Sequence, residues 1–192
     1  MVADKNNVKA LARQNQQETT IFFNQLKRKK PKQLDDVVHV IHDKVSDKFD
    51  CLTCGNCCKT ISPRITDKDI ERIAQKQRMK EVDFIARYLH VDDDQWFVFN
   101  ETPCPFLMPD NYCMIYEYRP KACSEYPHTD RRRFYQLLDL TMQNRELCPI
   151  VYEVVERLKK VDFGKKDEAD SKVPYSGNER KSGAKRVRHS RS

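Results

Sequence analysis

The spacing of apolar residues along the chain predicts a mainly helical fold. Two stretches have apolar residues at steps of three and four, which places those residues on one face of a helix. The first stretch, residues 33–47, has the stripe Leu34, Val37, Val38, Ile41 and Val45. The second begins at a proline, a favoured first helical residue, runs from 149 to about 160, and has the stripe Ile150, Val151, Val154, Val155 and Leu158. Both stripes are expected to face the core.

Three further helices are predicted from other signals. Residues 8–30 favour one helix that ends in a basic run before a proline, and its apolar side would be Leu11, Ile21, Phe22 and Leu26. Another helix is expected to begin after Thr66, with Asp69 in the capping position three residues later and a hydrophobic staple between Ile65 and Ile70. A helix over residues 81–89 would turn Val82, Ile85, Tyr88 and Leu89 inward.

The rest of the pattern is less regular. Residues 96–99, Trp-Phe-Val-Phe, predict one short β segment. Residues 103–127 are rich in proline and carry three cysteines, so we expect a loop-rich region with one helical turn at 115–118. Residues 134–140 are apolar and fit either a strand or a helix.

Eight cysteines give the chain its strongest chemical signal. Four lie within eight residues, at Cys51, Cys54, Cys57 and Cys58, and four more follow at Cys104, Cys113, Cys123 and Cys148. No signal peptide precedes them, and no apolar run approaches the ~18 residues of a membrane-spanning helix, so we expect a cytoplasmic protein without membrane insertion. Cytosolic thiols are kept reduced, which favours metal ligation over disulfides. All eight cysteines are therefore candidate metal ligands.

Zinc and iron–sulfur clusters are the candidate cofactors, because both prefer thiolate ligands. Two successive Cys-x-x-Cys steps, with Gly55 allowing a tight turn, are similar to one arm of a bacterial ferredoxin loop, although Cys58 directly after Cys57 breaks that spacing. Neighbouring side chains diverge, so this pair is expected to serve two adjacent metals or one polynuclear cluster. The cysteine count and the adjacent pair favour iron–sulfur. Eight thiols also match two four-cysteine sites, and the alternative is that some thiols are small buried hydrophobic residues.

The order of the cysteine motifs resembles the YkgJ-type cysteine-cluster family, also described as the CxxCxxCC zinc- or iron-chelating domain. The resemblance covers residues 50–158 and rests on Cys-x-x-Cys-x-x-Cys-Cys, Cys104-Pro-Phe-Leu, Cys113 to Cys123 with Arg119-Pro120 between them, Tyr126-Pro127 and Cys148-Pro149. It implies a mainly helical metal-binding domain. One branch of that family is similar to flagellin lysine N-methylase, which is associated with an iron–sulfur cluster. Ser124 departs from the family pattern, where arginine often follows the cysteine.

We therefore expect a small helical domain organised around a cysteine-ligated metal centre. Its parts would be an N-terminal helical extension (residues 1–49), the metal-binding domain (50–163) and a disordered basic tail (164–192). The tail holds nine Lys/Arg against four Asp/Glu, which is most of the chain's net charge of +7. The low hydrophobic content of 39% agrees with partial disorder.

Several other residues have two interpretations each. Arg119 would either donate hydrogen bonds to sulfur or lie on the surface. Tyr116 and Tyr126 are interpreted as packing aromatics. His39, His42, His90 and His128 are spare ligand candidates, although solvated or core-edge histidines are commoner.

Two functions of different classes follow from these features. The first is a metal-binding protein whose centre supports redox or methyl-transfer chemistry, and the second is a structural zinc module that binds a protein partner or, through the basic tail, nucleic acid. Metal storage or delivery is a third interpretation. The chain has four glycines and no glycine-rich phosphate loop, which disfavours nucleotide binding.

Overall fold

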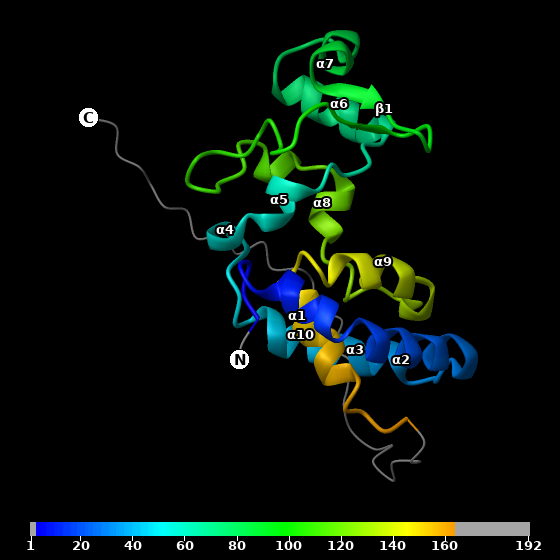
Figure 1. The fold of residues 1–192 in the computed structure, drawn as a ribbon. Helices are drawn as coiled ribbons and strands as arrows, with labels where there is room; N and C mark the ends of the chain where they lie inside the picture. Colours follow the sequence, from blue (N-terminus) through cyan, green and yellow to red (C-terminus); the bar gives the residue numbers. More distant parts are fainter. Residues whose placement is uncertain (1–2, 164–192) are drawn as a thin grey trace. The chain divides into compact units, whose positions relative to one another are not determined.

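The computed structural model describes residues 3–163 and confirms the predicted, mainly helical fold class (Figure 1). The α-helices are α1 (Val8–Gln14), α2 (Gln16–Lys29), α3 (Leu34–Ser46), α4 (Cys51–Cys54), α5 (Asn56–Thr60), α6 (Asp67–Lys76), α7 (Glu81–Tyr88), α8 (Lys121–Glu125), α9 (Leu138–Asn144) and α10 (Pro149–Leu158). The strands are β1 (Leu89–Val91) and β2 (Phe97–Phe99), and the 3-10 turns are η1 (Tyr116–Tyr118) and η2 (Phe134–Gln136). The predicted basic tail lies outside the described residues. In the part of the chain that the structure describes, no helix has the length and apolar character needed to cross a membrane.

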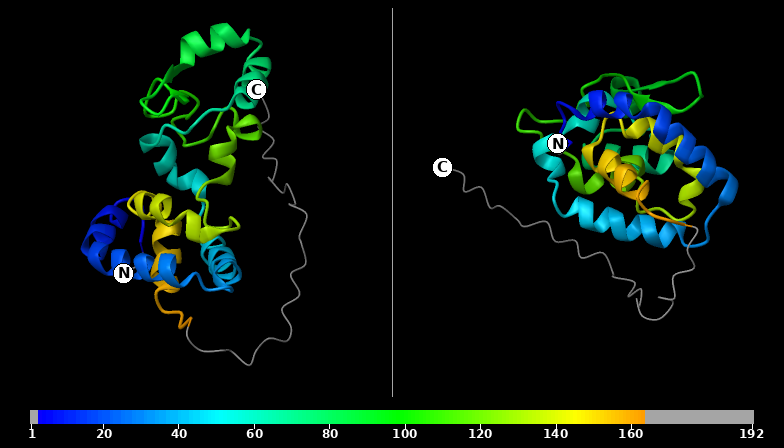
Figure 2. Two further views of the ribbon diagram at one scale, coloured as in Figure 1. Left: turned by 90° about the vertical axis from the view of Figure 1, so that its right-hand side faces the viewer. Right: turned by 60° about the horizontal axis from the view of Figure 1, so that its bottom comes forward.

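Helix α10 packs against α1, α3 and α9 (Figure 2). Its predicted stripe is confirmed, since all five stripe residues are buried. Helix α3 buries Leu34, Val38 and Val45 of its own predicted stripe, while Val37 and Ile41 are partly exposed. Helix α10 starts at Pro149, as predicted, and Cys148 is the residue that precedes its first turn. One cysteine is therefore attached to a helix that is fixed in the core.

The prediction of one helix over residues 8–30 is wrong at Asn15, where the backbone leaves helical angles (φ −99°, ψ 15°) between α1 and α2. Of the predicted apolar side, Leu26 is buried as expected, whereas Ile21 is 53% exposed. The other inward residues are Val8, Ala12, Thr19 and Phe23. The physical reason is Arg145, which is fully buried and donates hydrogen bonds to the Ala12 carbonyl, to Gln16 Oε1 and to Thr19 Oγ1. A guanidinium inside the fold requires polar partners on the inner side of these helices.

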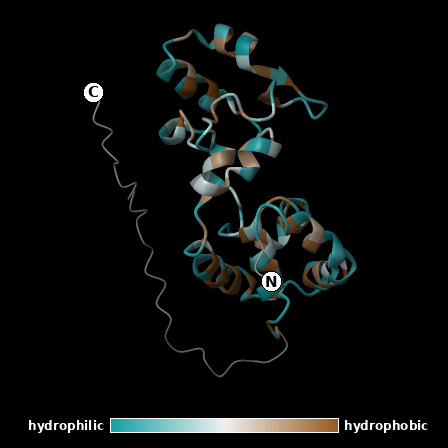
Figure 3. Cartoon of the chain, turned by 60° about the vertical axis from the view of Figure 1, so that its left-hand side comes forward, coloured by the Kyte–Doolittle hydropathy of each residue, from teal (hydrophilic) through white to brown (hydrophobic). Residues whose placement is uncertain are grey.

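A second core lies around the β1–β2 hairpin. The strands pair antiparallel with Leu89 opposite Phe99, which confirms the β segment predicted at 96–99 and corrects Leu89 from helix to strand. The cluster consists of Ile65, Ile70, Ile73, Ala74, Phe84, Leu89, Phe99, Phe106 and Ile115. The predicted inward side of α7 is wrong for Val82, which is 75% exposed, because Phe84 fills the core instead. Figure 3 shows apolar and polar residues on the same helices, as expected for elements buried on one side.

Helix α6 begins as predicted. The Thr66 hydroxyl accepts a hydrogen bond from the Asp69 N–H, and the Asp69 carboxylate accepts one from the Thr66 N–H at 3.0 Å, which is a capping box. The Asp69 carboxylate also accepts the Lys121 N–H at 3.0 Å and pairs with Arg72 at 2.6 Å. This one carboxylate therefore joins α6 to α8, the helix that carries Cys123.

The connecting segments are partly as predicted. The helical turn expected at residues 115–118 is confirmed as η1, while α8 is a short helix that the proline-rich pattern did not predict. The ambiguous stretch at 134–140 is helical, formed by η2 and the start of α9. The loop-rich cysteine region is therefore shorter than expected, and Cys123 lies on a helix.

Candidate metal centre

The eight cysteines come from segments that are far apart in the sequence. Helix α4 carries Cys51 and Cys54, helix α5 carries Cys57 and Cys58, and α8 carries Cys123, while Cys148 caps α10. The other two lie in the connection from β2 to η1, at Cys104 and Cys113. All eight are free thiols. Thiols are therefore the main metal-binding groups of this region.

The turn between α4 and α5 depends on Gly55. Its backbone is in the left-handed region (φ 57°), where a residue with a side chain is strained. A Cβ at this position would lie 3.0 Å from the Cγ and Oδ1 atoms of Asn111. The Asn111 amide in turn donates to the Thr53 carbonyl at 3.2 Å, which holds the Cys104–Cys113 connection against the turn. Glycine therefore allows both the sharp turn and the close approach of the second cysteine-bearing segment.

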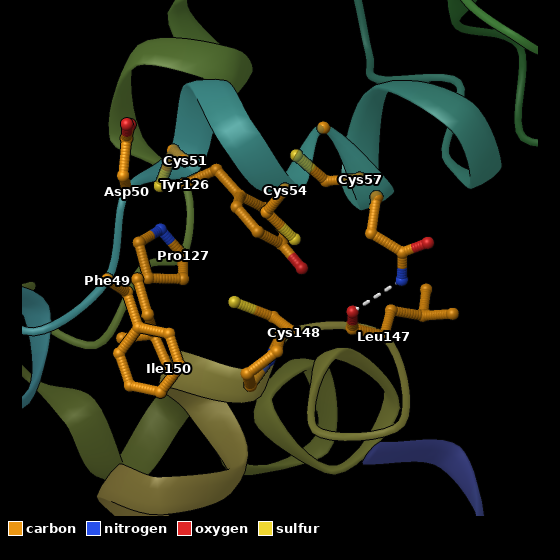
Figure 4. Close-up of a pocket in the computed structure, with 13 residues that line it drawn as sticks. Phe49, Asp50, Cys51, Cys54, Cys57, Tyr126, Pro127, Leu147, Cys148 and Ile150 are labelled. Carbon is orange, nitrogen blue, oxygen red and sulfur yellow. Dashed lines mark hydrogen bonds between the residues drawn. The ribbon is translucent and has the colours of Figure 1, made fainter. Parts of the chain in front are cut away.

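Four of the cysteines line one small cavity of about 40 Å³ (Figure 4). These four, which we call the Cys148 set, are Cys51, Cys54, Cys57 and Cys148. The Asn56 amide donates to the Leu147 carbonyl at 2.7 Å, and this bond fixes α5 beside the residue before Cys148. The cavity therefore joins thiols from α4, α5 and the start of α10.

The remaining four cysteines, which we call the Cys123 set, lie around α5 and the hairpin that follows β2. They are Cys58, Cys104, Cys113 and Cys123. The Cys104 N–H donates to the Cys58 carbonyl at 2.8 Å, and Cys113 is bridged to Leu107 in an antiparallel pairing. After burial, the strongest influences on the Cys123 thiol are the charges of Cys104, Cys58 and Cys113, all of which raise its pKa. The set is therefore mutually close, although it is drawn from three segments.

Cys57 and Cys58 connect the two sets, with their sulfurs 4.0 Å apart. A hydrogen bond from Cys57 lowers the pKa of the Cys58 thiol to about 7, whereas the same bond and burial raise the pKa of Cys57. One thiolate is therefore stabilised by the neutral thiol of its neighbour.

Burial raises the pKa of Cys104 and of Cys148 to about 11, and that of Cys123 to about 12. At neutral pH these thiols are protonated unless a cation lies beside them, since a coordinated thiol loses its proton. Among residues 3–163, no group of three or more Cys, His, Asp or Glu side chains lies close enough together to hold a metal ion. The donor type nevertheless fits zinc or an iron–sulfur centre, because soft thiolates are the ligands that both prefer.

Tyr126 has a role that the sequence did not reveal. Its hydroxyl points into the cavity of the Cys148 set, between Cys54 and Cys148 (Figure 4). The hydroxyl is buried and lacks a hydrogen-bond partner with suitable geometry among the described residues, although Cys148 lies close to it. Tyr126 therefore offers an unused donor next to the thiols. An interpretation as a packing aromatic accounts for the ring and not for this hydroxyl.

Arg119 is partly buried and follows η1 in the chain. Its guanidinium stacks on the Tyr116 ring at 3.9 Å and donates to the Tyr116 carbonyl at 2.9 Å. Burial raises the pKa of Cys51, Cys113 and Cys123, and the positive charge of Arg119 offsets a small part of that rise. Of the two interpretations of Arg119, hydrogen bonding to sulfur is not seen among the described residues, because the hydrogen bond and the ring contact of its guanidinium both go to Tyr116. Tyr116 itself is partly exposed and holds this arginine in place.

The histidines have partners other than cysteine. Both ring nitrogens of His42 are hydrogen-bonded, to Thr129 and to Ser46, and His39 bonds the Arg131 carbonyl. His90 bonds the Asn100 side chain at 3.2 Å. His128 lies edge-on to the Tyr126 ring, with the ring centres 5.8 Å apart, and burial lowers its pKa. The two helical histidines therefore serve α3 packing.

A comparison with known protein families gives a match to the cysteine-rich part of the chain. Residues 50–150 match the family described as "CxxCxxCC: Putative zinc- or iron-chelating domain". The matched span begins just before Cys51 and ends just after Cys148, so it contains all eight cysteines. No curated protein and no solved structure matches the chain significantly.

Proposed function

Because the chain belongs to the CxxCxxCC family of zinc- or iron-chelating domains, we propose that its eight cysteines bind an iron–sulfur centre used in redox or methyl-transfer chemistry. The observation that carries this proposal is that free thiols from separate segments come together, since four cysteines line one cavity and the Cys104 N–H donates to the Cys58 carbonyl. Eight thiols are more than one zinc ion requires. The proposal places the protein in the cytoplasm, where thiols stay reduced.

The chain's own residues would hold such a centre through thiolate sulfur. An iron–sulfur centre supplies one-electron redox chemistry when bound. Two groups of this chain act on the sulfurs: the Tyr126 hydroxyl lies close to Cys148, and the positive charge of Arg119 reaches Cys51 and Cys123. Hydrogen bonds and positive charge near sulfur stabilise the more reduced, more negative state, so both residues would raise the reduction potential.

The test is purification without oxygen, followed by visible absorption and measurement of iron, zinc and sulfide per chain. The proposal predicts a brown protein that contains iron and sulfide together. A colourless protein with zinc and no sulfide would contradict the iron–sulfur proposal and leave metal binding intact. A folded chain without any metal would contradict both.

A structural zinc module is the second candidate, and a specific observation favours it. Helices α5 and α8 contain no buried residue, so apolar packing contributes little to holding them in place. Metal-binding free energy can replace that missing packing, as it does in small zinc domains. Such a module would present its surface to a protein partner, or to nucleic acid through the basic residues 164–192. The same metal and sulfide measurement separates it from the first candidate.

A further inference from the structure

We infer that the eight cysteines form two separate four-cysteine centres, the Cys148 set and the Cys123 set, with the adjacent residues Cys57 and Cys58 assigned to different centres. This inference rests on the proposed function, because it assumes that the cysteines bind metal. It goes further by stating which thiols share a metal. Four cysteines per centre is the ligand number of closed zinc sites and of most iron–sulfur clusters.

The Cys148 set is defined by a shared cavity. Its four cysteines, drawn from α4, α5 and the start of α10, line the same space, and Cys58 does not line it. The Asn56–Leu147 hydrogen bond keeps α5 next to the α10 start, and Figure 4 shows the side chains of Cys54 and Cys148 directed toward this space. The Tyr126 hydroxyl enters the same cavity as an unpaired donor. The cavity therefore brings four cysteines and one hydroxyl from separate segments to the same space, which is why we assign these cysteines to one centre.

The Cys123 set is defined by backbone pairing around α5 and the β2–η1 connection. The hydrogen bond from Cys104 N–H to the Cys58 carbonyl brings these two residues together, and the Leu107–Cys113 bridge folds the following segment back. Cys113 is close enough for its charge to raise the pKa of Cys104. Cys104 and Cys113 both pack against the second core. The Lys121 N–H bond to Asp69 fixes the start of α8, and with it Cys123. The second centre is thus supported by a different core from the first.

Consecutive residues on a helix point about 100° apart, so two neighbouring cysteines on α5 face different surroundings. Cys57 is one of the residues that line the cavity with Cys148, while Cys58 is paired through its backbone with Cys104. The two sulfurs are 4.0 Å apart, so the centres would be close neighbours. The family motif ends in two adjacent cysteines, and this geometry assigns each of them to a different metal centre.

The inference can be tested with single variants, one in each set. We expect Cys148→Ala and Cys123→Ala each to retain half of the metal of the wild-type protein, measured by elemental analysis after anaerobic purification. A double variant within one set, such as Cys148→Ala with Cys54→Ala, should lose no more metal than the single variant Cys148→Ala loses. A pair across the sets, Cys148→Ala with Cys123→Ala, should remove all of it. Ser124→Ala, next to Cys123, is the matched control and should keep full metal content.

A second measurement avoids variants that fail to fold. The wild-type protein is treated with increasing chelator, alkylated, and digested, and the protection of each thiol is measured by mass spectrometry. We expect protection to be lost in two groups of four that correspond to the two sets. If Cys57 and Cys58 lose protection in the same group, or if all eight thiols lose protection together, the inference is overturned. A wild-type protein without metal would instead contradict the proposed function, so the two failures are distinguishable.

Discussion

Gly55 is the residue whose backbone angles make the turn between the two helices that carry Cys51 to Cys58. Its left-handed angles end α4 and start α5 within one residue, and Asn111 occupies the space where a side chain would begin. Without this turn, Cys54 and Cys57 could not follow each other on two separate helices. The sequence indicated that a glycine between cysteines allows a tight turn, but the contact with Asn111, 56 residues later, could not be predicted from local pattern.

We expect Gly55→Ala to lower the free energy of unfolding by about 2 kcal/mol, because alanine is strained in the left-handed region. Urea unfolding measures this change. Adding Asn111→Ala should recover only part of the loss, since it removes the steric contact and leaves the backbone strain. Asn111→Ala alone is the control. A Gly55→Ala protein as stable as the wild type would show that the turn tolerates a side chain.

The unpaired hydroxyl of Tyr126 gives a second expectation at this scale. Groups that hydrogen-bond metal ligands typically contribute about 10–100-fold to metal affinity. We expect Tyr126→Phe to weaken metal retention within that range in a chelator competition assay. The exposed residue Tyr112 provides the matched control, Tyr112→Phe, which should bind metal as the wild type does. Equal retention by both variants would mean that the hydroxyl does not contact the bound group.

Asp69 acts at the scale of secondary-structure elements. Burial opposes its ionisation, but hydrogen bonds from Thr66, Arg72 and the Lys121 N–H together lower its pKa below 3.8. A carboxylate with a lowered folded-state pKa stabilises the protein above its unfolded pKa, and that stability is lost only as pH falls through the folded value. Its contribution is therefore constant across the neutral range.

We expect Asp69→Asn to destabilise the protein by about 2 kcal/mol, because it weakens a cap and leaves an arginine without its buried partner. Urea unfolding at pH 5 and pH 8 should give the same difference from the wild type at both values. Asp67→Asn, in the same first turn but exposed, should cost less than about 1 kcal/mol through the helix dipole alone. Similar losses for both variants would mean that the links from Asp69 to Arg72 and α8 contribute nothing.

The elements differed in how well the sequence predicted them. Helices α3, α6 and α10 have strong local signals, namely an apolar stripe, a capping box and an initial proline, and all three were predicted correctly. The break at Asn15 depends on Arg145, which reaches α1 and α2 from more than 120 residues away. Strand β1 depends on its partner β2. Contacts with partners far away in the sequence leave no periodic signal in the segment whose structure they determine.

The candidate site shows the same limit. Cysteine spacing alone identified the eight thiols as candidate ligands and a metal as the cofactor class, and the family match supports metal binding generally. Spacing could not assign Cys104, Cys113, Cys123 and Cys148 to partners, because that assignment depends on the Cys104–Cys58 pairing and on the cavity at the start of α10. The free hydroxyl of Tyr126 was likewise visible only in three dimensions.

At the scale of the whole molecule, the described residues divide into parts with and without apolar support. Helices α3 and α10 bury many side chains, whereas α5 and α8 bury none. We expect removal of metal to increase hydrogen exchange in residues 50–60 and 103–127, which would be held by the bonds of the proposed centre. Helices α3 and α10 should stay protected, because apolar packing holds them in place. Exchange measured by mass spectrometry before and after chelation tests this. Uniform loss of protection would show that one cooperative unit depends on the metal.

The adjacency of Cys57 and Cys58 also limits how the length of the chain can change. Inserting one residue between them would rotate the second sulfur by about 100° around α5 and carry it away from Cys104. The turn between β1 and β2 has no such restriction, since it lies between paired strands and carries no cysteine. Insertions and deletions should therefore be tolerated in that turn and excluded from the Cys57–Cys58 dipeptide. In a library of single-residue insertions, the peptide bond between Cys57 and Cys58 should be the least tolerant position.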